Sequence, residues 1–316
     1  MQTAWPNTLI SLRHTALNAA VRPLLRGLSR ASGLAASVIM PTCNKATYLD
    51  LTLATLEHQV FPADCWELIV IDDASADTTP QVLGFYEERG RLPLIHRRSA
   101  KNRGRAGARN DALALARGQV VIFLDDDRLT GPDFLLQHTL RHRGDRCVVH
   151  GNTNRRIHTH QSPPVTREEV IRLKRLQALI SLYMDSRTYL AAAEAFGERG
   201  LGWVFLTGGN SSALRERVEA VGGFDEEFRG WGFEDNDLAL RLQESGLPLR
   251  FERTISTLHQ VHPAGPTKAA DHERNMCRFF RKHPGLDCPT LEPLFTLKVP
   301  PDQWIEQQPE RDCLTT

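Results

Sequence analysis

Three adjacent aspartates, Asp125 to Asp127, directly follow a short apolar run at residues 120–124. The run is rich in β-branched and aromatic residues and too short for a free-standing helix, which is typical of a strand buried on both faces. Neighbouring carboxylates repel one another unless a cation lies among them, and oxygen ligands favour Mg²⁺ or Mn²⁺. The pattern predicts that Asp125 and Asp127 hold a divalent ion that binds a diphosphate. A solvated acidic loop is the alternative.

A second acidic pair, Asp72 and Asp73, follows a second apolar run at residues 67–71. A carboxylate at a strand end can accept hydrogen bonds from a pyrimidine imide N–H or from ribose hydroxyls. Helix capping by Asp77 or Thr78 is the alternative role for this turn.

From residue 36 onward, short apolar runs alternate with segments of helical periodicity. The predicted strands are 37–40, 67–71, 92–96 and 120–124, and the predicted helices are 49–58, 78–89 and 107–117. This alternation predicts βαβ units and a largely parallel sheet. Ligands in such sheets collect at the carboxyl ends of the strands, so both acidic clusters should lie at one edge.

A glycine-containing loop, KNRGRAGARNDA, opens the third of these helices. Its backbone N–H groups and its arginines suit an anion, with Asn102 and Arg109 as candidate binding residues. An ordinary loop-to-helix junction would have a similar sequence.

Beyond Asp127 the alternation loses its regularity. Thr166 and Glu169 fit a capping box that opens a long helix. This helix would carry Leu173, Leu176, Ile180 and Met184. Residues 201–206 are predicted to form a strand, followed by a turn at 207–210 where the backbone could approach a ligand closely.

The stretch Gly222–Leu242 combines several glycines, one tryptophan and a group of acids. The flanking glycines place Trp231 at a tight bend. Glu234, Asp235 and Asp237 then precede a leucine-rich segment, as acids do at helix N-termini, and could serve only the helix dipole. A tryptophan beside a carboxylate pair also fits a sugar pocket, because the ring offers an apolar face and a hydroxyl needs a base.

Two histidines, His259 and His262, follow a predicted strand at 249–255. A single histidine is usually structural. Two of them beyond a strand, in a chain with an unpaired aspartate triplet, are candidate metal ligands.

Composition and cysteine spacing argue against several classes of protein and of binding site. The 316 residues carry a net charge of +1, and no basic stripe with interleaved aromatics indicates a nucleic-acid partner. The six cysteines lack CxxC spacing, so neither a zinc site nor a disulfide framework is expected and a cytoplasmic location is the simpler assumption. No apolar run approaches the ~20 residues of a membrane-spanning helix.

The chain divides by pattern into a basic amphipathic N-terminal segment, a central domain and a C-terminal extension. Their bounds are 1–34, 35–265 (with halves 35–135 and 136–265) and 266–316. The first segment could contact an anionic membrane surface through residues 9–30, although a packed or frayed helix is favoured. The last is expected to hold a helix at 271–282 and then an irregular tail.

Seven motifs occur in a fixed order between residues 36 and 265: SVIMPTCN, IVIDDASAD, NRGRAGARN, FLDDD, TGGNSS, GGFDEEF and WGFEDNDLALRL. Together they resemble the family 2 type glycosyltransferases of the GT-A fold. RGWGFEDNDLALRL, with the later LHQ, resembles the WGxED region of chondroitin-polymerase-like and β-1,4-galactosyltransferase-like enzymes. The resemblance implies an α/β GT-A fold, with a Rossmann-like, mostly parallel sheet flanked by helices. It also implies that residues 35–135 form the nucleotide-binding half of the catalytic domain and residues 136–265 its acceptor half.

The resemblance also implies roles for individual residues. Asp235 would be the catalytic base. Asp127 would bind the metal directly, with Asp125 at the ribose or the metal and His259 as a distal ligand, or His262 in its place. Asp73 would contact the nucleotide base, and Thr42 and Arg109 would line the nucleotide pocket. Asn102, Trp231 and Glu234 complete the predicted donor site.

The implied activity is a metal-dependent, inverting hexosyl or N-acetylhexosaminyl transfer, using Mn²⁺ or Mg²⁺. A UDP-sugar is the expected donor, and a glycan, lipid, peptide or small metabolite would supply the acceptor hydroxyl. One alternative is a GT-A-like sugar nucleotidyltransferase, although VIMPTCNKAT lacks the glycine-rich phosphate loop that this chemistry usually wants. A non-catalytic nucleotide or glycan binder is the other.

Overall fold

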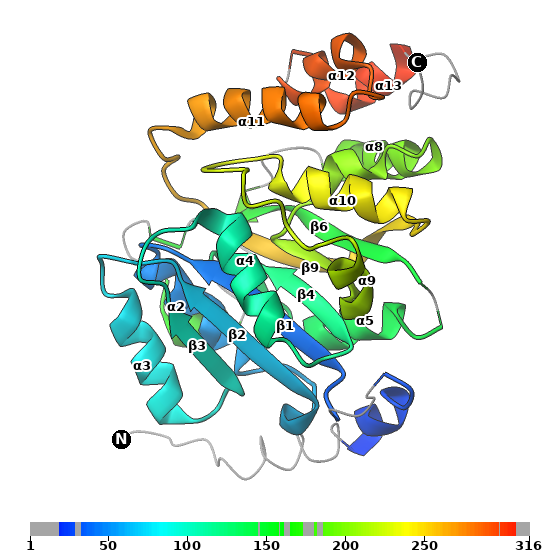
Figure 1. The fold of residues 1–316 in the computed structure, drawn as a ribbon. Coiled ribbons are helices and arrows are strands. Elements are labelled where there is room, and N and C mark those ends of the chain that lie inside the picture. Colours follow the sequence, from blue (N-terminus) through cyan, green and yellow to red (C-terminus); the bar gives the residue numbers. More distant parts are fainter. Residues whose placement is uncertain are drawn as a thin grey trace.

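The computed structural model of the protein describes residues 19–28, 33–144, 146–157, 159–160, 165–172, 180–181, 186–296 and 298–307. A nine-stranded sheet lies at the centre, and helices cover it (Figure 1). The strands are β1 (Ala36–Thr42), β2 (Trp66–Asp72), β3 (Leu94–Arg98), β4 (Val120–Leu124), β5 (Arg128–Thr130), β6 (Val148–Ile157), β7 (Ile180–Ser181), β8 (Asn210–Leu214) and β9 (Leu249–Gln260).

The helices follow the strands along the chain. They are α2 (Ala46–Leu56), α3 (Thr79–Arg89), α4 (Gly104–Leu115), α5 (Phe134–Arg141), α6 (Arg167–Arg172), α8 (Ser186–Glu198), α9 (Arg215–Ala220), α10 (Glu234–Glu244), α11 (Lys268–Lys282), α12 (Cys288–Phe295) and α13 (Pro301–Gln307), with short 3-10 helices η1 (Ala63–Cys65) and η2 (Gly202–Phe205). The seven elements predicted between residues 36 and 124 are confirmed, with small shifts at their ends.

The sheet has the order β3-β2-β1-β4-β8-β6-β9-β5, and β7 pairs with β6. β3, β2, β1 and β4 pair in parallel, as the alternation of strands and helices predicts. Beyond them, β8 runs antiparallel to β4 and β6, and β6 and β9 form another parallel pair. The predicted α/β class is confirmed, and its regular parallel part is the half that contains the two acidic clusters.

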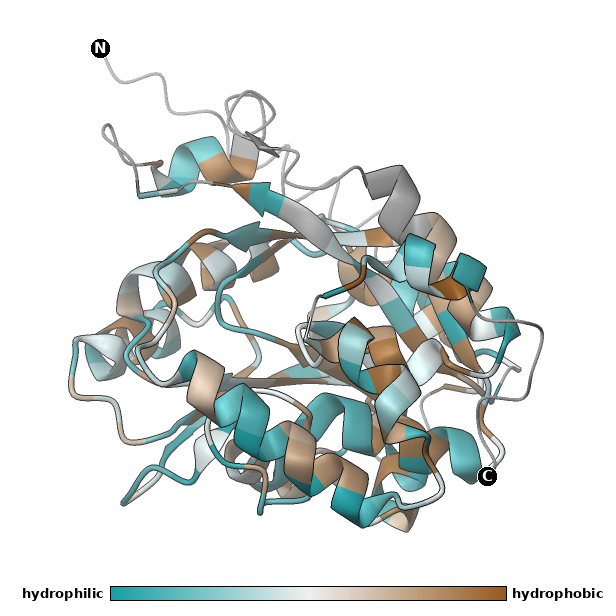
Figure 2. Cartoon of the chain, turned by 90° about the horizontal axis from the view of Figure 1, so that it is seen from above, coloured by the Kyte–Doolittle hydropathy of each residue, from teal (hydrophilic) through white to brown (hydrophobic). Residues whose placement is uncertain are grey.

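Each face of the sheet has its own hydrophobic cluster. Successive side chains of a strand point to opposite faces, so the continuous apolar strands supply both. Ile39 and Phe123 pack with residues of α4, α8, α10 and the C-terminal helices. Val38 and Ile122 pack with residues of α2, α3 and α5. Figure 2 shows the hydropathy of each residue, and the helices around the sheet carry both hydrophobic and hydrophilic residues.

Residues 201–206 were predicted to form a strand, and this prediction is wrong. Residues 202–205 form the 3-10 helix η2, and Asn236 Nδ2 donates hydrogen bonds to the carbonyls of Trp203 (3.1 Å) and Val204 (2.9 Å). A short apolar run is compatible with both a buried strand and a buried helical turn. The periodicity of the sequence therefore could not distinguish these two structures.

The capping box before α6 is confirmed, but the long helix is not. Thr166 N donates to Glu169 Oε2 at 3.0 Å, and Glu169 N donates to Thr166 Oγ1 at 3.3 Å. Ile180, expected on the same helix, instead extends the sheet in β7, where it pairs with Ile157. Leu173, Leu176 and Met184 lie outside the described residues.

The C-terminal tail is helical where irregular structure was expected. Helices α12 and α13 follow α11, and the prolines that suggested an irregular tail fall largely at helix starts. A proline in the first turn costs no hydrogen bond, because its missing N–H would have no helical partner there. Asp287 caps α12 by accepting a hydrogen bond from Thr290 N. The three helices pack on α8 and α10 through one cluster (Figure 1).

The described part of the N-terminal segment packs on the domain. Residues 19–24 are helical. Val21, Leu25 and Leu28 are buried in the cluster that contains Trp66. Arg22 pairs with Asp64 at 2.6 Å. The predicted membrane contact gains no support from this packing, and residues 9–18 and 29–30 lie outside the described residues. Within the described residues, no helix has the length and apolarity needed to cross a membrane.

A buried histidine network stabilises the middle of the sheet. His138 Nε2 lies 2.8 Å from Asn210 Oδ1, and His138 Nδ1 lies 2.9 Å from the Ser212 hydroxyl. Since the amide oxygen only accepts, Nε2 carries the hydrogen and Nδ1 must accept. The neighbouring His142 Nε2 also contacts Ser212 Oγ at 2.8 Å. Burial lowers the pKa of His138 to about 4 and that of His142 to about 3.

We expect stability to fall as pH drops from about 6.5 toward about 4. These histidines have folded pKa values below 6.5, so the unfolded chain binds more protons in that window and the contribution of the neutral rings is lost. Urea unfolding at several pH values measures this. His138→Gln should reduce the pH dependence, whereas His96→Gln, at a half-buried position of β3, should leave it unchanged. An equal pH dependence in His138→Gln would contradict the assignment.

Candidate active site

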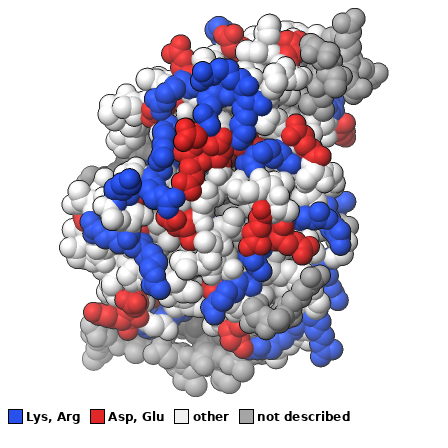
Figure 3. All heavy atoms as spheres, viewed as in Figure 1, with Lys and Arg blue, Asp and Glu red and all other residues white. Residues whose placement is uncertain are grey.

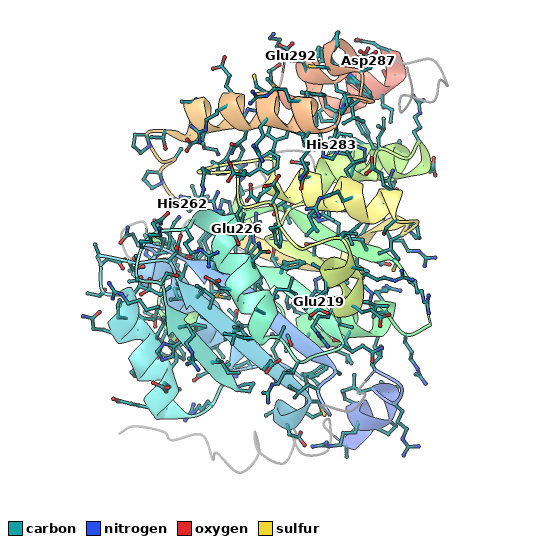
Figure 4. The ribbon with its side chains drawn as sticks, viewed as in Figure 1. Glu219, Glu226, His262, His283, Asp287 and Glu292 are labelled. Atoms are coloured by element: carbon teal, nitrogen blue, oxygen red, sulfur yellow. The ribbon has the colours of Figure 1, made fainter. Side chains whose placement is uncertain are left out.

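Asp127 is the centre of a candidate metal site. Its Oδ2 lies 2.9 Å from His262 Nε2 and 3.5 Å from His259 Nε2, and its side chain is 11% exposed. One ligand atom from each of the three residues falls within a 4.8 Å group, the one such group in the described part of the chain. Figure 4 shows His262 at the sheet edge where the parallel strands end. The structure thus brings together Asp127 and both histidines, while Asp125 is not part of the group.

The donor set of this group fits a divalent ion such as Mn²⁺, which accepts both carboxylate oxygen and imidazole nitrogen. Burial would raise the pKa of Asp127, but hydrogen bonds from His259 and His262 outweigh it and hold that pKa well below its usual range. Burial lowers the pKa of His259, so its ring is neutral near pH 7 and able to bind a metal. The hydrogen bond to Asp127 raises the pKa of His262.

Strand β9 and Gln260 position the two histidines. His259 pairs with Arg128 of β5, directly after the aspartates, and Gln260 N donates to Asp127 O at 2.9 Å. The buried Gln260 side chain donates to Tyr48 O at 2.9 Å, which ties β9 to helix α2. The sequence analysis missed Gln260, although its place between two candidate ligands in LHQVH was a usable signal.

Lys45 also faces Asp127 and was not predicted. Its Nζ lies 3.8 Å from Asp127 Oδ2 and 5.0 Å from the centre of the Tyr48 ring. Because Lys45 immediately precedes α2, the backbone fixes its place beside the metal group.

Asp126, whose role the sequence left open, binds the end of β1. Its Oδ2 accepts a hydrogen bond from Thr42 Oγ1 at 2.7 Å, and its carbonyl accepts one from Thr52 Oγ1 at 2.9 Å. Burial, with repulsion from Asp127, raises the pKa of Asp126 to about 7. The middle residue of the triplet therefore joins the triplet to two neighbouring elements.

Asp125 and Asp235 are joined by a buried arginine. Arg109 is 1% exposed, and its guanidinium contacts Asp125 (2.9 Å), Asp235 (2.8 Å) and Glu234 (3.1 Å). The attraction of three carboxylates outweighs burial and raises the pKa of Arg109. The nucleotide contact implied by the resemblance is a different role and stays a prediction. The bridge places the acid pair of α10 beside the triplet that follows β4.

Two glycines allow this close approach. A Cβ on Gly208 would lie 2.7 Å from Asp235 Oδ1, and a Cβ on Gly209 would lie 2.7 Å from Asp125 Oδ2. Both contacts are shorter than real side chains show, so a larger residue at either position would push the carboxylates apart. The predicted turn at residues 207–210 is thus a close backbone approach to the acids themselves.

The Asp235 side chain is partly exposed, and its pKa is raised. It lies in the first turn of α10, and its side chain is 18% exposed. Burial, partly offset by Arg109 and reinforced by Glu234, raises the pKa of Asp235 to about 7. A carboxylate that titrates near the working pH suits proton transfer.

The other acids of α10 have structural contacts. Glu234 is 4% exposed and contacts Arg109. Asp237 is fully buried and contacts Arg241 and His283 at 2.7 Å and 2.9 Å. Figure 4 shows His283 between α11 and α10, so this contact joins the two helices.

Two of the remaining predicted donor residues line one cleft at the sheet edge. Thr42 and Asp73 line it together with the aspartates at 125–127. The oxygens of Asp73 accept hydrogen bonds from Arg103 N (2.7 Å) and Gly104 N (2.8 Å), so Asp73 caps α4. Asn102 Nδ2 donates to Asp73 O at 3.2 Å. These contacts hold the cleft wall in place, and the nucleotide contacts stay predictions.

Trp231 lies at the predicted bend between two glycines with positive φ, Gly230 (+77°) and Gly232 (+95°). The indole packs against α11 rather than against the sheet. Its ring centre is 5.4 Å from that of His272 and 4.2 Å from Lys268 Nζ. Sequence reasoning gave the C-terminal extension no function and missed both partners.

The sequence matches two family descriptions. Residues 37–207 match Glycosyl transferase family 2, which is more than half of the chain. Residues 187–262 match the N-terminal domain of galactosyltransferase, and this stretch contains the glycine turn, the acid pair and both candidate metal histidines.

Several proteins have similar sequences. The uncharacterized glycosyltransferase YfnE of Bacillus subtilis (strain 168) is 30% identical over 297 residues, which are 84% of this chain and 75% of YfnE. Validoxylamine A glucosyltransferase of Streptomyces hygroscopicus subsp. jinggangensis (strain 5008) is 32% identical over 79% of this chain, which spans 61% of that protein. Chondroitin synthase of Escherichia coli is 24% identical over 84% of this chain and 42% of its own length.

Two solved structures have a similar fold. The mannosyltransferase PcManGT from Pyrobaculum calidifontis, in complex with GDP-Man and Mn²⁺, gives a TM-score of 0.55 at 20% identity and covers 95% of this chain and 80% of its own. S. aureus TarS 1–349, in complex with UDP-GlcNAc, gives 0.55 at 19% identity and covers 80% and 67%. Both are glycosyltransferases by name or bound donor, and the likeness confirms the GT-A fold.

The order of the motifs, the α/β sheet and the converging acid clusters agree with these matches. The resemblance drawn from the sequence is therefore confirmed at the level of family and fold. The chain belongs to glycosyl transferase family 2 and is a glycosyltransferase with the GT-A fold.

Proposed function

We propose that the protein transfers a sugar from a nucleotide diphosphate, with inversion, to an acceptor hydroxyl, and that it requires a divalent ion. One observation carries this proposal: Arg109 contacts both Asp125 and Asp235, so the acids near the metal group and the proposed base belong to one site. Separate sites on two sides of the molecule would have excluded the reaction.

Asp127, His259 and His262 would hold the ion, Mn²⁺ or Mg²⁺. A bound ion there would stabilise the charge that develops on the departing diphosphate. Thr42 and Asp73, in the cleft wall beside these ligands, would contact the nucleotide. The nucleotide-sugar complexes of TarS and PcManGT support a nucleotide-sugar donor, and the Mn²⁺ of PcManGT supports the choice of metal.

Asp235 would accept the proton of the acceptor hydroxyl as that oxygen attacks the anomeric carbon. Inversion needs one base and no covalent nucleophile, because a single in-line displacement inverts the centre. Glu234, the neighbouring carboxylate, is buried against Arg109 and so is poorly placed to attack a sugar. Arg109 would act as a positioning residue that holds the base relative to Asp125.

The acceptor could be a small metabolite or a polymer. The relatives include enzymes of both kinds by name: a validoxylamine A glucosyltransferase and TarS, a poly(ribitol-phosphate) N-acetylglucosaminyltransferase. A screen with Mn²⁺ and UDP-, dTDP- and GDP-sugars, measuring nucleotide release, tests the proposal and names the donor. Release of pyrophosphate instead would support a nucleotidyltransferase, and release of neither would support a non-catalytic binder.

We expect Asp235→Asn to reduce kcat by roughly 10²- to 10⁴-fold, the usual value of general-base assistance. The asparagine oxygen can still accept the Arg109 hydrogen bond, so the fold and donor binding should survive. Steady-state kinetics and calorimetric binding of the nucleoside diphosphate measure the two effects. Near full turnover in Asp235→Asn would show that another group takes the proton. Asp133→Asn, on the surface before α5, is the matched control.

We expect metal affinity to fall in His259→Ala and in His262→Ala by more than the roughly 10- to 100-fold that loss of a group supporting a ligand typically causes, because each removes one ligand atom. The loss in Asp127→Ala should be larger. Titration of the full chain with Mn²⁺ alone measures affinity without relying on activity. His96→Ala removes a histidine outside the group and should bind Mn²⁺ normally. If only one of the two histidine variants binds weakly, the other histidine is not a ligand.

We expect kcat to decline below about pH 7, since Asp235 has a pKa of about 7 and its protonated form cannot accept a proton. The rate should fall about tenfold per pH unit on the acid side and level off above. The measurement keeps Mn²⁺ and donor saturating at each pH, so that weaker metal binding does not produce the same decline. A flat profile between pH 5.5 and 8 would contradict the assignment.

A further inference from the structure

Lys45 is a cation of the cleft wall to which the proposed function gives no role. Its side chain is 22% exposed and lines the same cleft as Asp125 and Asp127. Its Nζ lies 3.8 Å from Asp127 Oδ2, which is beyond the reach of a hydrogen bond. No group in the described part of the chain accepts a hydrogen bond from this ammonium. Its three N–H donors are therefore available to a ligand in the cleft.

Other cations near the site have close acidic partners. Arg103 lies 2.7 Å from Glu226, and Arg274 lies 2.7 Å from Asp271. Acidic and basic side chains lie side by side across the face that carries α4 and α11 (Figure 3). The separation of 3.8 Å at Lys45 is longer, so its ammonium is attracted to a carboxylate without being hydrogen-bonded to it.

The ring of Tyr48 holds the ammonium in place. Lys45 Nζ lies 5.0 Å from the centre of that ring, within the range of a cation–π attraction. The same ring meets the His262 ring edge-on, with 5.5 Å between the ring centres. The carbonyl of Tyr48 accepts a hydrogen bond from the buried Gln260, which ties this part of α2 to β9. Packing therefore places the ammonium on the α2 side of the metal group.

Two cationic side chains already face one carboxylate, Asp127. Lys45 and Arg128 approach its two oxygens at 3.8 Å and 3.9 Å. Arg128 is held in the sheet, because its guanidinium donates to Thr153 O at 2.8 Å, whereas Lys45 has no such hydrogen bond. With a divalent ion at Asp127, two further positive charges would lie beside Lys45. Like charges held together repel one another, so the ammonium then needs an anion.

We propose that Lys45 binds the diphosphate of the donor, and that its ammonium exchanges Asp127 for the phosphate oxygens once that carboxylate holds the ion. This inference rests on the proposed function and adds a residue to its site. A lysine ammonium donates strong, charge-assisted hydrogen bonds to phosphate oxygens. When the bond between the anomeric carbon and the diphosphate oxygen breaks, its electron pair stays on that oxygen, and the acceptor proton goes to Asp235. Lys45 stabilises the charge on the diphosphate and transfers no proton.

The test compares Lys45→Met with the unchanged full chain in three binding measurements. Titration with Mn²⁺ alone should show binding at least as tight in Lys45→Met, because a cation beside the ion is removed. Calorimetry at saturating Mn²⁺ should show UDP binding roughly 10- to 100-fold weaker, the usual loss for a hydrogen bond to a charged group. Uridine, which lacks the diphosphate, should bind both chains equally. Lys45→Arg should recover most of the UDP affinity.

Lys298→Met is the matched control, since Lys298 is an exposed lysine of the C-terminal extension that pairs with Glu292 at 3.2 Å. This variant should bind Mn²⁺ and UDP normally. Weaker binding of Mn²⁺ alone in Lys45→Met, or an equal loss of uridine and UDP affinity, would show that Lys45 only shapes the cleft and would overturn the proposal. Unchanged UDP binding would overturn it as well. GDP and guanosine replace these probes if the donor screen identifies a GDP-sugar.

Sugar transfer distinguishes this proposal from the proposed function. Normal transfer by Lys45→Met, together with unchanged UDP binding, removes only the role of Lys45. An affinity for UDP that depends on Lys45, without transfer from any nucleotide sugar, supports that role and removes the proposed function.

Discussion

The active site depends on one buried cation shared among three carboxylates. Arg109 is almost fully buried, and without it Asp125, Glu234 and Asp235 would meet with no counter-charge. Burying a charge is costly unless it is paired and hydrogen-bonded, and removing one partner of such a group leaves uncompensated charge. The sheet edge and α10 are therefore held in one arrangement, and the distance between the metal side and the base is fixed by an interaction that need not touch either substrate.

The metal side is built differently, by strand pairing. His259 reaches Asp127 because β9 pairs with β5, the strand that directly follows the aspartates. Gln260 binds that ladder to α2, whose first turn follows Lys45. A ligand group on a paired strand is positioned more rigidly than one on a free loop, which suits a centre that must hold an ion and a diphosphate in fixed geometry.

Local sequence patterns predicted the elements between residues 36 and 124 well, because each of these elements is determined by a short continuous stretch of sequence. Each strand there is a continuous apolar run, and each acidic cluster follows such a run directly, so parallel pairing alone places them at one edge. The partners of Arg109 lie 16, 125 and 126 residues away, and no spacing rule connects them. The resemblance supplied the identity of Asp235 as the base, whereas the bridge to Asp125 required the fold. The prediction for residues 201–206 was wrong because a short apolar run fits both a strand and a helical turn. The prediction for the prolines after α11 was wrong because a proline fits both an irregular segment and the first turn of a helix.

The C-terminal helices control the geometry of the base as well as the packing of Trp231. Phe233, the residue before α10, has a φ of +71°, a conformation that costs about 1–3 kcal/mol and persists only where its surroundings impose it. Asn275 of α11 imposes it: its side chain donates to the carbonyls of Trp231 (3.2 Å) and Gly232 (2.9 Å). The Phe233 ring packs against Phe279 of the same helix. Since the next turn of chain carries Asp235, α11 fixes the direction from which the base approaches the cleft, and a domain ending before α11 would lose that constraint.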